Sequence, residues 1–289
     1  MHPIDGRFTY HVSMKSLQTE AAGLAKFIEQ YPNLVVLTGA GISLDSGIPV
    51  YRDEAGVWQP GEPIKHQSFL QDERARQRYW SRSWYGWPRI RDAQPNAAHR
   101  RLVTLEQRGV VAQLITQNVD GLHQRAGHQR VIDLHGRVDQ VKCLQCPATY
   151  TRQAVQHMLD EANNWPDMVP ETLRPDGDMA IAPSLVDGIT LPRCEVCGGH
   201  LMPHVVFFGG SVPRERVLRC KAAVEEADAL LVVGSSLMVF SGFRLCRQAA
   251  KADKPIGIIN PGVTRADGLA SHRFYSAAGP LLTQALVGD

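Results

Sequence analysis

The chain has 289 residues, 44% of them hydrophobic and 21% charged, a composition typical of a globular protein with a sizeable buried core. Its 31 basic and 29 acidic residues leave a net charge of +2, which argues against a nucleic-acid surface as the main function. No apolar run reaches the roughly 18 residues that cross a membrane, and the N-terminus does not resemble a secretion signal. We therefore expect a cytoplasmic protein without a specific nucleic acid or membrane as partner, and we expect a monomer.

Helix-like and strand-like segments alternate along the chain. Helices are expected over residues 13–31, 97–107, 214–227 and 243–252. Strands are expected over residues 34–37, 110–116, 131–134, 201–208, 229–233 and 256–259. Because alternating strands and helices build parallel sheets, the pattern predicts an α/β fold with a doubly wound parallel sheet. Residues 142–204 interrupt this alternation and indicate a separate small module.

The first expected strand breaks at Gly39-Ala40-Gly41, where missing side chains let backbone N–H groups approach a ligand. The turn fits no standard fingerprint, because Leu44 stands where Gly-x-Gly-x-x-Gly needs its third glycine. A polar segment follows directly and could fold over a bound nucleotide. Its notable residues are Ser43, Tyr51, Arg52 and Asp53.

A second turn of small residues, Gly234-Ser235-Ser236, follows the strand at 229–233, and Asn260 follows the strand at 256–259. Small residues and hydroxyls at successive strand ends suit an adenosine ribose and adenine. An ordinary strand-to-helix turn explains either feature alone. Their presence together with Gly39-x-Gly41 favours a nucleotide site.

Polar side chains also follow two other expected strands. Gln117, Asn118 and Asp120 come after one strand, and His135 comes after the next. A lone histidine in such a place is often structural, yet beside these polar groups it could also serve as a general base with a pKa near neutral. The residues alone leave these two interpretations open. His99 and His123 are interpreted as structural.

Four of the six cysteines form two Cys-x-x-Cys pairs, Cys143 with Cys146 and Cys194 with Cys197. In a chain without a secretion signal this spacing favours one zinc ion over disulfides or redox chemistry. Four thiolates leave no open coordination position, so the zinc would be structural. Cys220 and Cys246 stand among apolar neighbours and are expected to be buried fillers.

Residues 59–91 combine many aromatic side chains with many arginines. Interleaved aromatics and arginines can bind single-stranded nucleic acid. Their mixed helical spacing and the nearly neutral chain instead favour a packed helical cover that forms core and cleft wall.

The motifs taken together resemble the sirtuin family from about residue 20 to the C-terminus. They are Gly39-Ala-Gly-Ile-Ser43, Ser46-Gly-Ile-Pro49, Tyr51-Arg52-Asp53, Thr116-Gln-Asn-Val-Asp-Gly-Leu-His123, Leu134-His-Gly136, both Cys-x-x-Cys pairs, Val205-Val-Phe-Phe-Gly209, Gly234-Ser-Ser236 and Asn260. Other motifs are similar to class II, the branch that contains the mitochondrial lipoamidase-type sirtuin and bacterial relatives. They are Tyr79-Trp80, Gly86-Trp87-Pro88, Pro95-Asn96, Arg174-Pro-Asp-Gly-Asp178 and Cys197-Gly-Gly-His-Leu201.

The resemblance implies an NAD-dependent protein-lysine deacylase with a Rossmann-type domain and a smaller helical and zinc-binding domain. The NAD-binding domain would comprise residues 14–53, 92–141 and 205–289. The small domain would combine a helical module, 54–91, with a zinc-binding module, 142–204. Acyl-lysine proteins or peptides would be the substrates.

The resemblance also implies roles for individual residues. NAD would be bound by Gly39, Ala40, Gly41, Ser43, Tyr51, Arg52, Asp53, Gln117, Asn118, Asp120, Gly234, Ser235, Ser236, Asn260, Pro261, Gly262 and the backbone of Ala278. The catalytic residues would be His135, Asn118 and Asp120, with His135 as the base. The substrate peptide would add as a strand along Val205, Val206, Phe207, Phe208 and Gly209.

In the implied mechanism, the acyl oxygen attacks the anomeric carbon of the ribose and nicotinamide leaves. His135 then takes a proton from the ribose hydroxyls, and water finally releases the free lysine and O-acyl-ADP-ribose. Two alternatives remain, protein mono-ADP-ribosylation at the same site and a non-enzymatic NAD-sensing zinc protein. Hydride transfer is disfavoured because Leu44 spoils the conventional fingerprint.

Three residues depart from the family pattern. His204 and Gly210 replace acidic residues that commonly flank the Val-Val-Phe-Phe-Gly segment, so the charge preference for the peptide is open. Pro261 replaces an aliphatic residue and removes one backbone N–H. None of the three touches the predicted catalytic cluster, and we expect a competent enzyme.

Overall fold

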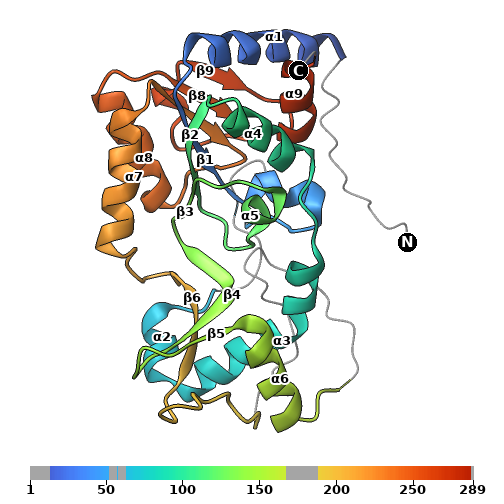
Figure 1. Cartoon of the computed structure of the whole chain (residues 1–289), viewed down its shortest axis with the longest axis vertical. Coiled ribbons are helices and arrows are strands. Elements are labelled where there is room, and N and C mark those ends of the chain that lie inside the picture. Colours follow the sequence, from blue (N-terminus) through green and yellow to red (C-terminus); the bar gives the residue numbers. More distant parts are fainter. Residues whose placement is uncertain (1–13, 52–56, 58–62, 167–187, 288–289) are drawn as a thin grey trace.

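A six-stranded parallel sheet forms the centre of the computed structural model, which describes residues 14–51, 57, 63–166 and 188–287 (Figure 1). The strand order is β3-β2-β1-β7-β8-β9. The strands are β1 Leu34–Thr38, β2 Val111–Thr116, β3 Val131–Asp133, β7 Ala229–Val233, β8 Ile256–Ile259 and β9 His272–Phe274. The order reverses between β1 and β7, which is where doubly wound sheets bind their ligands. The predicted doubly wound parallel sheet is confirmed.

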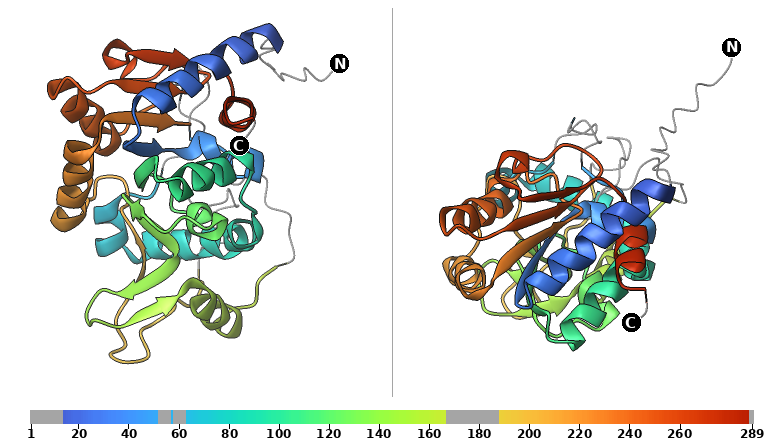
Figure 2. Two further views of the ribbon diagram at one scale, coloured as in Figure 1. Left: turned by 45° about the horizontal axis from the view of Figure 1, so that its top comes forward. Right: turned by 90° about the horizontal axis from the view of Figure 1, so that it is seen from above.

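Both faces of the sheet are covered by helices, so its strands are apolar on both sides (Figure 2). The covering helices are α1 Met14–Gln30, α4 Ala97–Gln107 and α9 Ala278–Ala285 on one face, and α7 Arg214–Glu226 and α8 Phe240–Lys251 on the other. In β1, Leu34 and Val36 belong to the first core, while Val35 and Leu37 belong to the second. This alternation explains why the strand is one continuous apolar run.

A smaller antiparallel sheet, in the order β5-β4-β6, lies at the other end of the molecule (Figure 1). Its strands are β4 Gly136–Cys143, β5 Thr149–Thr151 and β6 Leu201–Val205. The helices of this part are α2 His66–Gln71, α3 Glu73–Asp92 and α6 Arg152–Ala162, with α5 Leu122–Ala126 between the two parts. Phe69, Tyr79 and Trp80 are buried in its core, which confirms the expected helical packing of the aromatic segment.

The two turns of small residues pack directly against each other. The first continues as a 3-10 helix, η1 Ala40–Ser46, after Gly39. Gly41 N donates to Gly234 O at 2.8 Å, and Gly234 has a φ of 62°, a backbone conformation that favours glycine. A Cβ on Gly41 would lie 2.9 Å from Gly234 O. Glycine is therefore required on both sides of this contact.

Some expected elements differ in extent from the structure. The strand expected over 201–208 ends at Val205, because the chain leaves the small sheet after pairing with Gly136. It belongs to the antiparallel sheet, and the expected resumption of parallel strands begins only at β7. Helix α8 begins at Phe240, three residues before the expected start. The sequence interpretation did not include β4, β5, α6, β9 or α9.

Cys220 and Cys246 are fully buried between α7, α8 and the sheet, which confirms them as core residues. Burial raises the pKa of Cys220 to about 11 and that of Cys246 to about 12, so both are neutral thiols. Within the described part of the chain, none of the helices is long and apolar enough to cross a membrane.

Candidate active site

A cavity of about 1150 Å³ opens at the carboxyl ends of the parallel strands, where the two parts of the molecule meet. Most of the predicted site residues line it, and they come from segments far apart in the chain. They are Gly39, Ala40, Gly41, Ser43, Tyr51, Gln117, Asn118, Asp120, His135, Val205, Val206, Phe207, Phe208, Gly234, Ser235, Ser236, Asn260, Pro261, Gly262 and Ala278. Gly209 stands outside this lining set. Arg52 and Asp53 lie outside the described residues.

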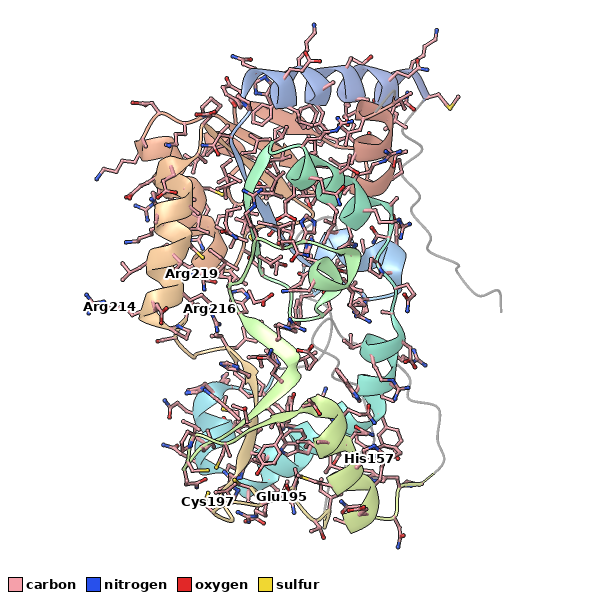
Figure 3. The ribbon with its side chains drawn as sticks, in the orientation of Figure 1. His157, Glu195, Cys197, Arg214, Arg216 and Arg219 are labelled. Carbon is pink, nitrogen blue, oxygen red and sulfur yellow. The ribbon has the colours of Figure 1, made fainter. Side chains whose placement is uncertain are left out.

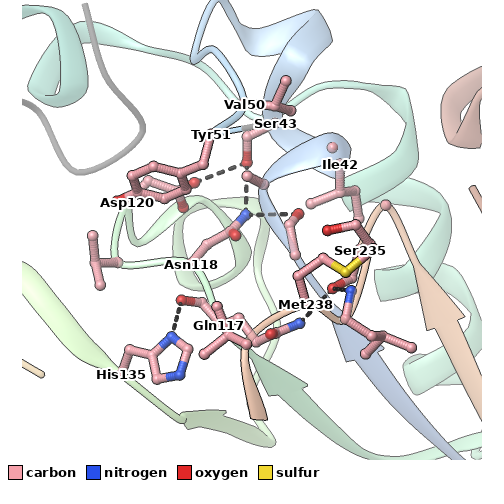
Figure 4. Close-up of a pocket in the computed structure, with 18 of the residues that line it drawn as sticks. Ile42, Ser43, Val50, Tyr51, Gln117, Asn118, Asp120, His135, Ser235 and Met238 are labelled. Carbon is pink, nitrogen blue, oxygen red and sulfur yellow. Dashed lines mark hydrogen bonds between the residues drawn. The ribbon is translucent and has the colours of Figure 1, made fainter. Parts of the chain in front are cut away.

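Asn118, Ser43 and Asp120 form one hydrogen-bonded cluster (Figure 4). Asn118 Nδ2 donates to Gly39 O and to Ser43 Oγ, both at 3.1 Å, and Ser43 Oγ donates to Asp120 Oδ2 at 2.8 Å. The other carboxylate oxygen accepts from Leu122 N at 2.8 Å. Burial raises the pKa of Asp120, although these two hydrogen bonds lower it. The cluster ties the first glycine turn to the end of β2.

Gln117 connects the end of β2 to the second small-residue turn. Its Nε2 donates to Ser235 Oγ at 2.8 Å (Figure 4) and to Thr38 O at 3.3 Å. Asn260 is nine-tenths buried and donates from Nδ2 to Gly262 O at 2.9 Å. These side chains hold the strand ends in fixed positions around the cavity, which preorganises it for a nucleotide.

Both ring nitrogens of His135 make hydrogen bonds inside the cavity wall. Nδ1 lies 2.8 Å from the backbone O of Gln117, and Nε2 lies 2.7 Å from Ser241 Oγ. A carbonyl oxygen only accepts, so the hydrogen sits on Nδ1 and the lone pair sits on Nε2. Burial, with smaller effects from the charges of Arg216 and Arg244, lowers the pKa of His135 to about 4. The imidazole is therefore neutral at physiological pH and can accept a proton.

Sequence reasoning missed the residues that follow the second turn. Met238 lines the cavity from the loop before α8, and Phe240, Ser241 and Arg244 line it from the start of α8. The turn at Gly234 marked the loop, but nothing in the sequence indicated which of its residues meets His135, 106 positions away. Among the family departures, Gly210 and Pro261 line the cavity.

The four cysteines of the two Cys-x-x-Cys pairs gather in the small part of the molecule, with all four sulfur atoms within 4.8 Å of one another. Cys143 Sγ lies 3.5 Å from Cys197 Sγ, and Cys146 Sγ lies 3.6 Å from Cys194 Sγ. This arrangement fits a tetrahedral zinc ion with no open position, as predicted. Cys197 lies at the end of the molecule opposite α1 (Figure 3), and none of the four cysteines lines the cavity, so the zinc is structural.

The strand order, the paired glycine turns and the cavity at the switch point define a dinucleotide-binding α/β protein, and the neutral histidine gives that cavity a base. A model of the Sir2 family matches residues 39–241. The chain therefore belongs to the Sir2 family, the sirtuins, as its motifs predicted.

Named relatives and a solved structure are similar to this chain along most of its length. A protein of Xanthomonas campestris pv. campestris (strain 8004), named NAD-dependent protein deacetylase, is 51% identical over 90% of this chain and 88% of its own length. A protein of Monosiga brevicollis, named NAD-dependent protein deacylase SIR4, is 48% identical over 91% of this chain and 87% of its own length. The structure titled "Sir2-p53 peptide-NAD+" has a TM-score of 0.75 and 27% identity, over 91% of this chain and 96% of that one.

Proposed function

We propose that this cavity is the site where the protein removes acyl groups from lysine side chains with NAD as co-substrate. The chain is an NAD-dependent protein deacylase, in keeping with its family and with relatives about 50% identical that carry this name. The observation that carries the proposal is His135, a neutral base in the wall of a cavity that both glycine turns also line. A base placed beside a dinucleotide site can take a proton from a ribose hydroxyl.

The two halves of NAD would occupy opposite ends of the cavity. Gly39, Ala40 and Gly41 offer backbone N–H groups for the pyrophosphate, while Asn118 and Asp120 lie where the nicotinamide ribose would sit. The adenosine half would lie against the turn and strand ends on the other side. Those residues are Gly234, Ser235, Ser236, Asn260, Pro261, Gly262 and Ala278. Pro261 offers no N–H there, so the contacts must come from its neighbours.

The acyl-lysine peptide would bind along residues 205–209, which leave the small sheet and form one wall of the cavity. Several of their backbone groups are already engaged. Val206 N donates to His135 O at 2.7 Å, Phe207 O accepts from Gly210 N at 2.9 Å, and Phe208 O accepts from His66 N at 2.9 Å. An added strand would therefore pair through the backbone groups that face away from these partners. Two similar solved structures, titled as holding a p53 peptide and a propionylated peptide, support an acyl-peptide as the ligand.

The position of the Asp120 carboxylate suits the release of nicotinamide. Its carboxylate is held by two hydrogen bonds beside the place where positive charge develops on the ribose as nicotinamide leaves. Asn118 is fixed by Gly39 and Ser43, and its amide oxygen is left to accept a hydrogen bond from the ligand. His135 then acts after nicotinamide has left, when the ribose hydroxyl must lose its proton.

We also propose the domain division given by the sequence, with an NAD-binding domain at 14–53, 92–141 and 205–289 and a small domain at 54–91 and 142–204. Separate apolar cores on the parallel sheet and around the antiparallel sheet support it. We further propose that the protein is a monomer, that it lies in the cytoplasm, and that it belongs to class II of the family.

The test is a single-turnover assay with NAD and a panel of acyl-lysine peptides, followed by mass spectrometry. Wild type is expected to release nicotinamide, free lysine peptide and O-acyl-ADP-ribose. His135→Ala is expected to lose deacylation by a factor of 100 or more, a typical effect of removing a general base, roughly 10²–10⁴-fold. Thr19→Ala, which removes an exposed hydroxyl on α1, serves as the matched control.

Three results would contradict the proposal. Deacylation by His135→Ala at the wild-type rate would remove His135 from the mechanism. Label from radioactive NAD that stays covalently on protein, without peptide deacylation, would instead identify a mono-ADP-ribosyltransferase. NAD binding without NAD consumption would identify the protein as a non-enzymatic NAD sensor.

A further inference from the structure

Ser241 occupies a position that the proposed reaction makes critical. Its Oγ lies 2.7 Å from Nε2 of His135, and both residues line the cavity. Because Nδ1 carries the hydrogen, the serine hydroxyl donates to the lone pair of Nε2. That lone pair is the one that must receive the ribose proton. The Ser241 hydroxyl and the ribose hydroxyl would therefore both donate to Nε2 of His135.

The position of Ser241 is fixed by a well-packed helix. It is the second residue of α8, whose Leu245, Cys246 and Ala249 are buried against the sheet. Gln117, whose backbone O holds the other side of the His135 ring, also contacts this helix, since a Cβ on Gly242 would overlap its side chain. The imidazole is thus held between the end of β2 and the start of α8.

The charges around His135 disfavour its protonated form. Arg216 and Arg244 both lower its pKa, and Arg244 lines the cavity from the turn of α8 that follows Ser241. Once Nε2 has taken a proton, the new N–H needs an acceptor, because a buried donor without a partner is unfavourable. A serine hydroxyl can donate to the neutral ring and, after rotation, accept from the charged ring.

We infer that Ser241 is a positioning residue for the base, holding Nε2 toward the ribose and accepting its hydrogen bond after the proton has moved. In this step one proton passes from a ribose hydroxyl to Nε2, and the ribose oxygen bonds to the imidate carbon while the carbon–nitrogen π pair moves onto the lysine nitrogen. Ser241 keeps its own hydrogen. The inference rests on the proposed deacylase function. It assigns to the start of α8 a role in the second half of the reaction only.

The order of the two half-reactions gives a specific test. Nicotinamide leaves before His135 acts, so exchange of labelled nicotinamide into NAD, with the acyl peptide present, does not require the base. Deacylation of the same peptide does. A positioning defect at His135 must therefore separate these two rates, whereas a general loss of folding or NAD binding would lower both.

The experiment compares wild type, Ser241→Ala and Ser241→Thr in both assays, with unfolding curves for each. Ser241→Ala is expected to deacylate about tenfold more slowly, roughly the effect of one hydrogen bond, and to exchange nicotinamide within about twofold of wild type. Ser241→Thr keeps the hydroxyl and is expected to recover most of the deacylation rate. Thr19→Ala controls for the loss of a remote hydroxyl.

A wild-type deacylation rate in Ser241→Ala, or an equal loss of both rates, would overturn the inference. Failure of the wild type to consume NAD would instead overturn the proposed function. The ¹⁵N shifts of the His135 ring give a readout that does not need activity. They should show hydrogen on Nδ1 in wild type and a changed Nε2 signal in Ser241→Ala, and an unchanged Nε2 signal would also overturn the inference.

Discussion

At the residue scale, the environment of its two nitrogens suits His135 to the role of base in the proposed reaction. The carbonyl of Gln117 fixes the hydrogen on Nδ1, and burial keeps the ring neutral well below the ordinary pKa of about 6.5. A weaker base accepts a proton less readily, but it is never blocked by protonation near neutral pH. His135 is therefore a weaker base than free histidine, but its neutral form, which can accept a proton, stays fully populated.

This environment predicts an unusual pH profile. The pKa of His135 lies at about 4, so the neutral form stays populated as pH falls from 8 to 5.5. We expect the single-turnover deacylation rate to stay nearly constant over this range, without the fall centred near pH 6.5 that an ordinary histidine would give. The measurement needs a parallel check that the protein stays folded at each pH. A midpoint between 6 and 7 would show that burial does not control this histidine.

At the element scale, the contact between the two glycine turns determines the shape of the cavity. Gly234 has a φ of 62°, and a side chain there would collide with the backbone of Gly41 and Ile42. The ends of β1 and β7 could then no longer lie this close together. The glycines are needed for packing between turns as well as for the approach of phosphate.

Gly234→Ala is therefore expected to lower the free energy of unfolding by about 2 kcal/mol or more, because strain at positive φ adds to a backbone clash. NAD-dependent nicotinamide release should fall at least tenfold at a temperature where the variant is folded. Gly268→Ala, at a position with open space, is the control and should unfold within about 0.5 kcal/mol of wild type. Equal stability of both variants would refute the turn contact.

The zinc site is connected to the cavity wall through the small antiparallel sheet. Cys143 ends β4, and β4 pairs with β6, which leads into the cavity wall. Cys143 and Cys194 also belong to the core of the small part. Loss of the metal should loosen this sheet and the wall, while the parallel sheet keeps its own cores.

Chelation offers a direct measurement, because four of the five tryptophans lie in or beside the cores of the small part. They are Trp80, Trp84, Trp87 and Trp165. We expect zinc removal to change tryptophan fluorescence strongly and abolish deacylation, with far-UV circular dichroism largely retained. Full activity after complete zinc removal would show that the small sheet is stable without metal.

At the scale of the whole molecule, a cluster of buried histidines couples stability to pH. The rings of His99 and His123 lie 4.8 Å apart, and those of His123 and His128 lie 5.1 Å apart. Burial lowers the pKa of all three, that of His99 to about 3. His99 and His123 are almost fully buried, which agrees with the structural role expected for them from the sequence.

The sign of the effect follows from these shifts. Above pH 6.5 both folded and unfolded chains hold neutral histidines, and below it the unfolded chain takes up protons first. Each such histidine then lowers the free energy of unfolding by up to about 1.4 kcal/mol per pH unit. Asp120 and Asp133, whose pKa values are raised, act in the opposite direction nearer their own range.

We expect the free energy of unfolding, measured by urea titration, to fall between pH 7.5 and 5.5. His123→Gln should reduce this fall by the contribution of one histidine, at most about 1.4 kcal/mol over the whole range. His157→Gln, at an exposed position on α6, should keep the wild-type slope. Identical slopes in all three proteins would mean that the buried cluster does not control acid stability.

Local rules were enough to identify much of this protein from its sequence. Apolar runs of strand length, glycine turns after them and two Cys-x-x-Cys pairs depend on neighbouring residues, and they predicted the parallel sheet, the nucleotide turns and the zinc site. The polar residues after the strands were placed correctly because parallel strands bring their carboxyl ends to one edge of the sheet.

Only the tertiary structure decided what depends on contacts between distant segments. The strand at Leu201–Val205 looks parallel by its position in the chain, yet it pairs antiparallel with β4 because the small sheet offers it a partner. Ser241 carries no motif, and its hydrogen bond to His135 exists because two elements 106 residues apart pack side by side. The near-neutral pKa expected for His135 from the sequence is not found, since burial and the charges of Arg216 and Arg244, which lower it to about 4, arise only in the folded chain.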